Sequence, residues 1–189
     1  SDFITSAFPA HYGNALAGVF DLRMRNGNNE KYEFLGQMGF NGFELGAEGP
    51  LSIRTKSSFL VNYRYSMVAT IQKLGLDVGT GSATSYYQDI NFKVNILTKR
   101  AGVFSLFGMG GESHVRFVAI DDDNLYTTND GSLRERYFQS WTGVTGLTHT
   151  YFFNPGTSGK FTFAVSGFDS EYREDFFGRP KPEKTAFYK

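Results

Sequence analysis

The chain of 189 residues contains no cysteine, and this absence removes several classes of function. Without cysteine the protein has no disulfide framework, no thiolate-bound zinc and no thiol nucleophile. Its three histidines, His11, His114 and His149, are scattered without the spacing of metal ligands, which favours structural roles. The sequence therefore predicts no metal, no cofactor and no thiol chemistry.

Excess charge of one sign and long apolar runs are also absent. The 19 Lys and Arg residues equal the 19 Asp and Glu residues, so no basic surface for nucleic acid is predicted. No run approaches the roughly 18 apolar residues of a membrane helix, so a membrane role would require a β-barrel. Ser1–Ile4 lacks the features of a signal peptide, and we expect a processed chain or a piece of a larger one.

Aromatic residues and glycine are abundant, and alternation of apolar and polar residues is clearest in Tyr86–Thr98. A period of two places successive side chains on opposite faces of a strand. The pattern covers roughly ten residues, about the length that a tilted strand needs to cross a bilayer, and the charges suit a water-filled or plugged lumen. The predicted outward side carries Ile90, Phe92, Val94 and Ile96, and the predicted lumen-facing side carries Asp89, Asn91, Lys93 and Asn95.

Similar but weaker patterns predict an all-β chain with a strand at 18–25 followed by about seven more. Asn41-Gly42 predicts a tight hairpin, Gly49-Pro50 is expected to end a strand, and the charged segment 169–189, with two prolines, is expected to be a loop. The seven strands are predicted at 32–40, 43–48, 58–65, 86–98, 103–111, 134–153 and 160–168.

The predicted connections alternate in length. Those at 51–57, 98–102 and 154–159 are short, and those at 67–85 and 119–133 are long. Outer-membrane barrels have short turns on the periplasmic side and longer loops outside, so this alternation favours a barrel, with the tight Asn41-Gly42 reversal as an exception.

Residues 10–19 read Ala-His-Tyr-Gly-Asn-Ala-Leu-Ala-Gly-Val and follow Phe8-Pro9. This sequence motif resembles the end of the plug domain of TonB-dependent outer-membrane receptors, and it is most similar to the branch of these receptors found in Bacteroidota. Further similar motifs are Gly49-Pro50-Leu51, Arg64-Tyr65-Ser66, Tyr87-Gln88-Asp89 and Phe92-Lys93.

The resemblance implies that residues 1–27 end a plug domain and that residues 28–189 form the first strands of a barrel of about 22 strands. It further implies a place in the bacterial outer membrane and energised uptake of a siderophore, glycan, peptide or similar nutrient. The expected partners are membrane lipid, the nutrient and the TonB energy-transducing complex, which would act through a preceding N-terminal part. No enzymatic step is expected.

Charged residues on the predicted lumen side need partners or water, because an isolated charge in a narrow barrel is costly. The resemblance implies ion pairs between plug and barrel wall. The candidate contacts are Arg23, Arg25, Glu44, Glu48 and Arg64, and the alternative is that these residues are only hydrated.

Two rival interpretations remain at this stage. One is a soluble β-sandwich that binds a ligand such as a carbohydrate on its aromatic residues. The other is a small closed barrel with enzyme activity, for which the sequence offers no acid or base cluster. The acidic run Asp121–Asn124 lacks the spacing of an EF-hand loop, and Gly108–Gly111 lacks the lysine and helix of a phosphate loop.

Overall fold

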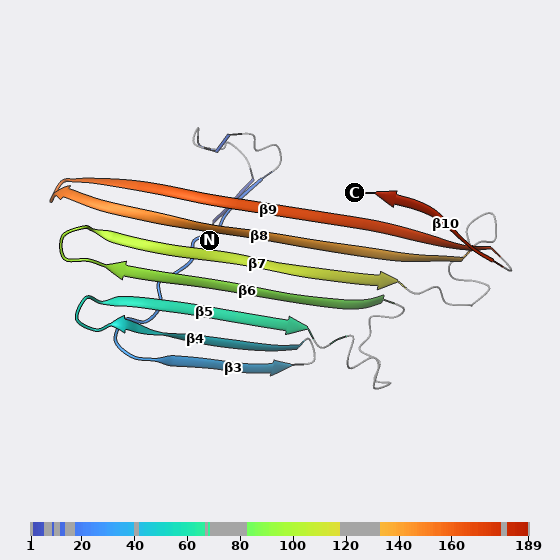
Figure 1. The fold of residues 1–189 in the computed structure, drawn as a ribbon, viewed down its shortest axis with the longest axis horizontal. Coiled ribbons are helices and arrows are strands. Elements are labelled where there is room, and N and C mark those ends of the chain that lie inside the picture. Colours follow the sequence, from blue (N-terminus) through green and yellow to red (C-terminus); the bar gives the residue numbers. More distant parts are fainter. Residues whose placement is uncertain are drawn as a thin grey trace.

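The computed structural model describes residues 2–5, 9, 12–13, 18–39, 42–66, 68, 83–117, 133–178 and 181–188. All ten regular elements of these residues are β-strands, which confirms the all-β prediction. They form one antiparallel layer of eight strands and a separate two-stranded sheet (Figure 1). Within the described residues, no helix has the length and hydrophobicity to cross a membrane.

The strands of the large sheet lie side by side in the order of the chain, so each pairs with its neighbours through simple hairpins. The two-stranded sheet consists of β1 (Asp2–Ile4) and β2 (Val19–Asp21). The large sheet consists of β3 (Glu33–Gly39), β4 (Gly42–Ser52), β5 (Ser57–Ser66), β6 (Ala83–Leu97), β7 (Val103–Phe117), β8 (Leu133–Asn154), β9 (Thr157–Gly178) and β10 (Lys181–Tyr188).

The two ends of the large sheet differ. At one end, here called the short-turn end, the strands are joined through residues 53–56, 98–102 and 155–156. At the other, the long-loop end, the connections are 40–41, 67–82, 118–132 and 179–180. Because the strands lengthen from 7 residues in β3 to 22 in β8 and β9, the sheet extends furthest at the long-loop end of β8 and β9.

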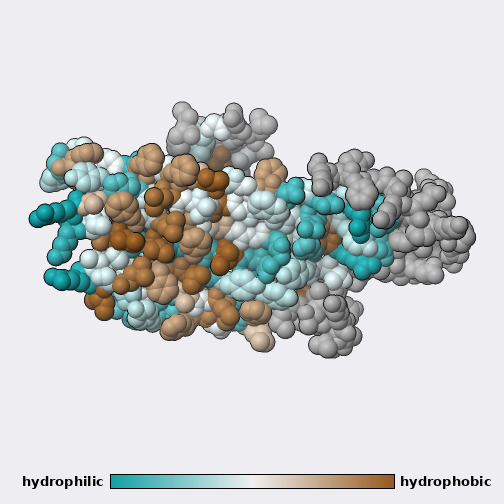
Figure 2. Space-filling view, viewed as in Figure 1, coloured by the Kyte–Doolittle hydropathy of each residue, from teal (hydrophilic) through white to brown (hydrophobic). Residues whose placement is uncertain are grey.

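Cross-strand register sorts the side chains onto two faces. Residues directly opposite in an antiparallel pair lie on the same face, and Val61 is opposite Phe92, while Asn62 is opposite Asn91. The band face, seen in Figure 2, carries Ala47, Phe59, Val61, Ile90, Phe92, Val94, Leu106, Leu147, Phe163 and Val165. The polar face carries Glu44, Glu48, Asn62, Arg64, Asp89, Asn91, Lys93, Asn95, Ser105, Thr148 and Thr162.

The sheet encloses almost no hydrophobic core. Among the described residues, Val68 is the only buried hydrophobic side chain, whereas Phe34, Phe161 and Phe163 are 81%, 68% and 61% exposed. Soluble domains bury the apolar face of a sheet against a second layer. Here the described strands form one layer, so the band face remains uncovered.

Two predicted boundaries near the start of the chain are wrong. The strand expected at 18–25 ends at Asp21, because its only strand partner is the three-residue β1, and the following residues are irregular. Gly49-Pro50 does not end a strand, since β4 continues to Ser52 with a register shift after Pro50. Proline is tolerated there because β3 no longer pairs with β4 beyond Glu48 and leaves an edge.

Two further predictions fail at the long-loop end. The strand expected to end at Gly111 continues to Phe117, and the segment 169–189, expected to be a loop, contains the last part of β9 and all of β10. Its charges have partners on β8: Arg136 Nε lies 3.2 Å from Glu174 Oε1. The proline Pro182 falls on the edge strand β10, where proline is acceptable. The run Asp121–Asn124 lies outside the described residues.

We predict that Gly102→Ala destabilises the β6–β7 turn. Gly102 has φ of 79°, and a Cβ there would lie 2.1 Å from the carbonyl oxygen of Thr150. Strain of this kind costs about 1–3 kcal/mol. Urea unfolding of the protein in detergent should show this loss for Gly102→Ala.

The matched control is Gly156→Ala in the β8–β9 turn, where a Cβ would meet only Asn154 Oδ1, at 3.7 Å. We expect its free energy of unfolding to change by less than about 0.5 kcal/mol. Equal stability of the two variants would contradict the strained position of Gly102.

Candidate functional site

The irregular segment 22–28, which follows β2, crosses the polar face of the large sheet. It passes behind the sheet in the view of Figure 1 and leads into β3. Two cavities of about 870 and 550 Å³ lie between it and the sheet. The polar face is therefore the side on which the N-terminal segment and the sheet together form cavities.

Glu48 on β4 holds this segment through three hydrogen bonds. Arg25 donates from Nη1 to Oε2 over 2.5 Å and from Nη2 to Oε1 over 2.6 Å, and the backbone N–H of Asn28 donates to Oε2 over 2.8 Å. A bidentate, charge-assisted pair is stronger than a single neutral hydrogen bond. The hydrogen bonds that Arg25 donates to Glu48 hold the pKa of Arg25 above its ordinary value, although partial burial acts to lower it. We call Arg25, Asn28 and Glu48 the Glu48 clasp.

Asn28 also organises the turn that enters β3. Its Oδ1 accepts hydrogen bonds from the backbone N–H groups of Glu30 and Lys31, and its Nδ2 donates to Glu33 over 2.9 Å. Lys31 forms an ion pair with the carboxylate of Glu33, and the hydrogen bond within this pair raises the pKa of Lys31. Asn28 is not among the site residues predicted from the sequence. The signal was present, because Asn within a turn cluster commonly hydrogen-bonds the backbone two residues on.

Backbone contacts bring the segment close to the sheet. A Cβ on Gly27 would lie 1.9 Å from the carbonyl oxygen of Phe59, so only glycine permits this approach. Lys93 on β6 donates from Nζ to the carbonyl oxygen of Met24 over 2.8 Å. The segment is therefore attached to three neighbouring strands, β4, β5 and β6.

Of the candidate contacts named from the sequence, Arg25 and Glu48 form an ion pair between the segment and the sheet, whereas Glu44 and Arg64 lie opposite each other within the sheet. Arg23 instead binds Asp21 within its own segment over 2.7 Å, and this hydrogen bond lowers the pKa of Asp21. Arg64 pairs with Asp89 across β5 and β6 over 2.8 Å, so its ion pair lies within the sheet.

The other polar residues predicted to share one side do lie on the polar face. Glu44 accepts a hydrogen bond from Asn62 Nδ2 over 2.7 Å, and Asn95 accepts one from Ser105 Oγ over 2.6 Å. Asn91 lines the smaller cavity and Lys93 the larger one. These side chains bind one another or face the cavities beneath the N-terminal segment.

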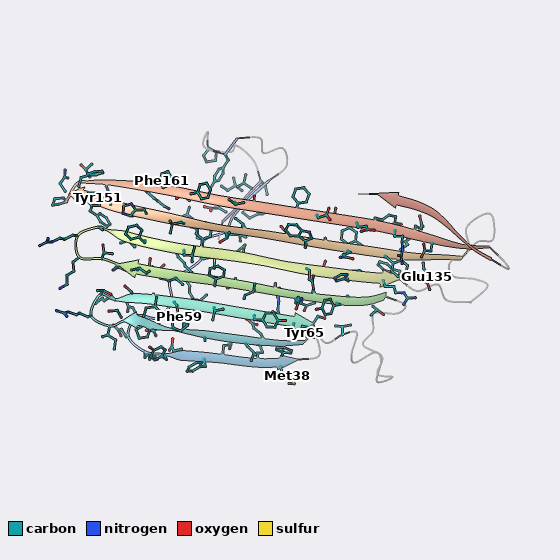
Figure 3. The ribbon with its side chains drawn as sticks, viewed as in Figure 1. Met38, Phe59, Tyr65, Glu135, Tyr151 and Phe161 are labelled. Atoms are coloured by element: carbon teal, nitrogen blue, oxygen red, sulfur yellow. The ribbon has the colours of Figure 1, made fainter. Side chains whose placement is uncertain are left out.

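Aromatic rings gather at both ends of the apolar part of the band face, here called the apolar band (Figure 3). Towards the long-loop end, Tyr65 stacks on Phe43 and meets Tyr86 edge to face. Towards the short-turn end, Phe104 stacks on His149, and Tyr151 packs against Phe153. Between these groups lie chiefly Val61, Ile90, Phe92, Val94, Leu106, Leu147, Phe163 and Val165.

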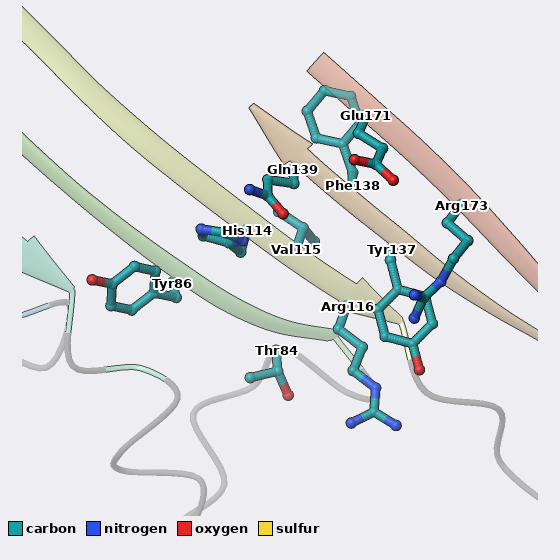
Figure 4. Close-up of a pocket in the computed structure, with 10 residues that line it drawn as sticks. All are labelled: Thr84, Tyr86, His114, Val115, Arg116, Tyr137, Phe138, Gln139, Glu171 and Arg173. Carbon is teal, nitrogen blue, oxygen red and sulfur yellow. The ribbon is translucent and has the colours of Figure 1, made fainter. Parts of the chain in front are cut away.

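Beyond the apolar band, the long-loop end of the same face is polar and holds a small pocket of about 270 Å³ (Figure 4). The ring of Tyr137 lies between two guanidinium groups, with Arg173 4.2 Å and Arg116 5.2 Å from its centroid. Glu135 accepts hydrogen bonds from both Arg116 and Tyr137. This cluster was not predicted from the sequence, because Arg173 falls in the segment that was expected to be a loop.

The described residues that line the two cavities are charged, polar and apolar side chains. Among the described residues, no group of three His, Asp or Glu side chains is arranged to hold a metal ion. No protein-family model, curated protein or solved structure matches the chain. The function is therefore argued from the geometry of the sheet and of the segment upon it.

We predict that Arg25→Ala loosens the N-terminal segment. The change removes two charge-assisted hydrogen bonds to Glu48 and leaves the one from the backbone N–H of Asn28. A spin label on Asn26→Cys should become markedly more mobile, and the absence of native cysteine makes this labelling site-specific within the chain.

Arg54→Ala, in the exposed turn at 53–56, is the matched control, because it removes the same charge away from the segment. It should leave the label spectrum unchanged. Unaltered mobility in Arg25→Ala would mean that the Glu48 clasp does not fix the segment.

Proposed function

We propose that residues 1–27 end the plug domain, and residues 28–189 form the first barrel strands, of a TonB-dependent outer-membrane transporter. Such a protein takes up a scarce nutrient by energised transport and changes no bond in it. The observation that carries this proposal is the uncovered apolar band on one face of the sheet, with the chain's own N-terminal segment on the other.

The height of the apolar band supports a membrane location. Along β8 it runs from Trp141 to Tyr151, about ten residues or roughly 33 Å at about 3.3 Å per residue. A strand tilted by roughly 40° then crosses about 25 Å, the height of the outward apolar band of outer-membrane barrels. The aromatic groups at both ends of the band correspond to the two interfacial girdles of such barrels.

The polarity of the two ends supports an orientation. Tight turns join the strands at the short-turn end, as on the periplasmic side of outer-membrane barrels. The polar part of the band face, with Glu112, Arg116 and Glu171, lies toward the long-loop end and would project beyond the bilayer. The long-loop end would therefore be extracellular.

The polar face supports the assignment of the N-terminal segment. In a barrel this face lines the interior, where a plug would lie, and the Glu48 clasp joins the segment to the wall there. The TonB complex would act through a preceding plug, and lipid would cover the apolar band. The rival soluble sandwich requires a second sheet over the band, so the single described layer favours the transporter.

Single-cysteine labelling of adjacent residues on β6 tests the proposal. In lipid vesicles, a spin label on Phe92→Cys should be accessible to oxygen and protected from an aqueous nickel complex. A label on Asn91→Cys should show the reverse or be protected from both, because it lies on the polar face beneath the segment. Equal access of both labels to the aqueous reagent would argue against a membrane strand.

A charge on the band face should also weaken assembly in lipid. Val165→Lys places an ammonium group near the middle of the apolar band, where it should cost about 2–4 kcal/mol. Ala164→Lys is the matched control on the adjacent polar-face residue and should cost less than about 1 kcal/mol. The measurement is the unfolding free energy in vesicles, and equal losses would contradict the lipid-facing assignment.

A further inference from the structure

The larger cavity on the polar face lies near the short-turn end, between residues 21–26 and strands β6–β9. Its volume of about 870 Å³ falls within the roughly 300–1,000 Å³ range of small-molecule sites. Its described lining comes from the segment 21–26 and from four strands of the sheet.

Two ammonium groups give this cavity a positive charge. Lys93 and Lys160 both line it, and within the described residues neither forms an ion pair with a carboxylate. Among the described lining residues Asp21 is the one carboxylate, and Arg23 donates hydrogen bonds to it over 2.7 and 2.9 Å. The ammonium of Lys160 acts on that of Lys93 as a like charge, so an anion between them would be favoured.

The remaining polar lining suits oxygen-rich ligands. Hydroxyl groups of Ser105, Thr148 and Thr150 and the amide of Asn95 face the same cavity. Hydroxyl and amide groups can donate hydrogen bonds to carboxylate or phosphate oxygens while the lysines supply charge. Apolar patches from Phe107 and Met109 complete the lining.

Most carboxylates of the polar face already have partners. Arg25 pairs with Glu48, Lys31 with Glu33 and Arg64 with Asp89, and Asn62 donates a hydrogen bond to Glu44. The smaller cavity beside the Glu48 clasp is lined by two of these carboxylates, Glu33 and Glu48, with Arg25. Lys93 and Lys160 have no carboxylate partner within the described residues, so an anionic solute would be attracted to the larger cavity that they line.

We propose that the larger cavity binds a small solute that carries more than one carboxylate or phosphate group, with Lys93 and Lys160 as its charged contacts. Resting on the proposed transport function, this identifies the transported class as polyanionic. Two separate cations suit a ligand with two separated anionic groups better than a single monovalent ion.

Calorimetric titration of the purified protein in detergent with citrate tests the proposal. Citrate should bind the parent protein, and the double variant Lys93→Gln/Lys160→Gln should bind it at least about tenfold more weakly, since hydrogen bonds to charged groups are strong. The charge-conserving variant Lys93→Arg/Lys160→Arg should retain binding. Lys99→Gln, in the exposed β6–β7 turn, should leave the affinity unchanged.

Circular dichroism and resistance to protease establish that each variant is folded. Citrate affinity of the folded glutamine variant within about twofold of the parent, or no citrate binding by the parent, would overturn the proposal. The outcome is separate from that of the labelling experiment on β6. Membrane insertion without citrate binding would remove this inference alone, whereas citrate binding without insertion would leave an anion site on a protein that is not a membrane transporter.

Discussion

The register of one antiparallel ladder is the constraint on which the rest of the structure depends. From Leu97 opposite Val103 to Ala83 opposite Phe117, β6 and β7 pair without a bulge, and the β7–β8 ladder is equally regular. Because side chains alternate with a period of two, a slip of one residue would move Lys93 to the band face and Phe92 beneath the N-terminal segment. The apolar band, the cavities and the Glu48 clasp all require that this register be kept.

A strand of this sheet can be predicted from the sequence where its own residues alternate between apolar and polar. It cannot be predicted where a side chain of the neighbouring strand occupies the place of a missing one. In β6 every residue from Asp89 to Ile96 obeys the alternation, so the strand and both faces can be predicted from it alone. In β7 the alternation fails, because Gly108 lies on the band face where an apolar side chain would be expected. The ring of Phe92 covers it: a Cβ on Gly108 would lie 2.6 Å from that ring. Such pairing of glycine with a neighbouring aromatic ring is visible only once the register is known.

Site residues were predictable only where one strand carries them. The polar set on β6 follows from local pattern, but the Arg25–Glu48 pair depends on the path of an irregular segment over the sheet, and the sequence offered it as one option among several charges. Lys160 gave no local signal, since its role depends on a cavity shared with β6 and the N-terminal segment. The charged end of β9 suggested a loop because charges usually mark solvated segments. Here Glu174 pairs with Arg136 on β8 instead.

The sheet has two exposed features, its edges and its apolar band. The edges require further strands, and the band requires an apolar surface to cover it. Among the described residues no strand pairs with the outer edge of β3, and β10 pairs with β9 only from Tyr172 onward, so both edges offer free backbone N–H and C=O groups. A second sheet packed on the band would cover the apolar side chains but leave these edges unpaired. Further strands of the same alternation would satisfy the backbone and continue the band around a closed wall, and a lipid surface would then cover the band without a second layer. Closure is thus the arrangement that would answer both requirements together, and it supports the proposal that the single layer is part of a barrel wall and not half of a sandwich.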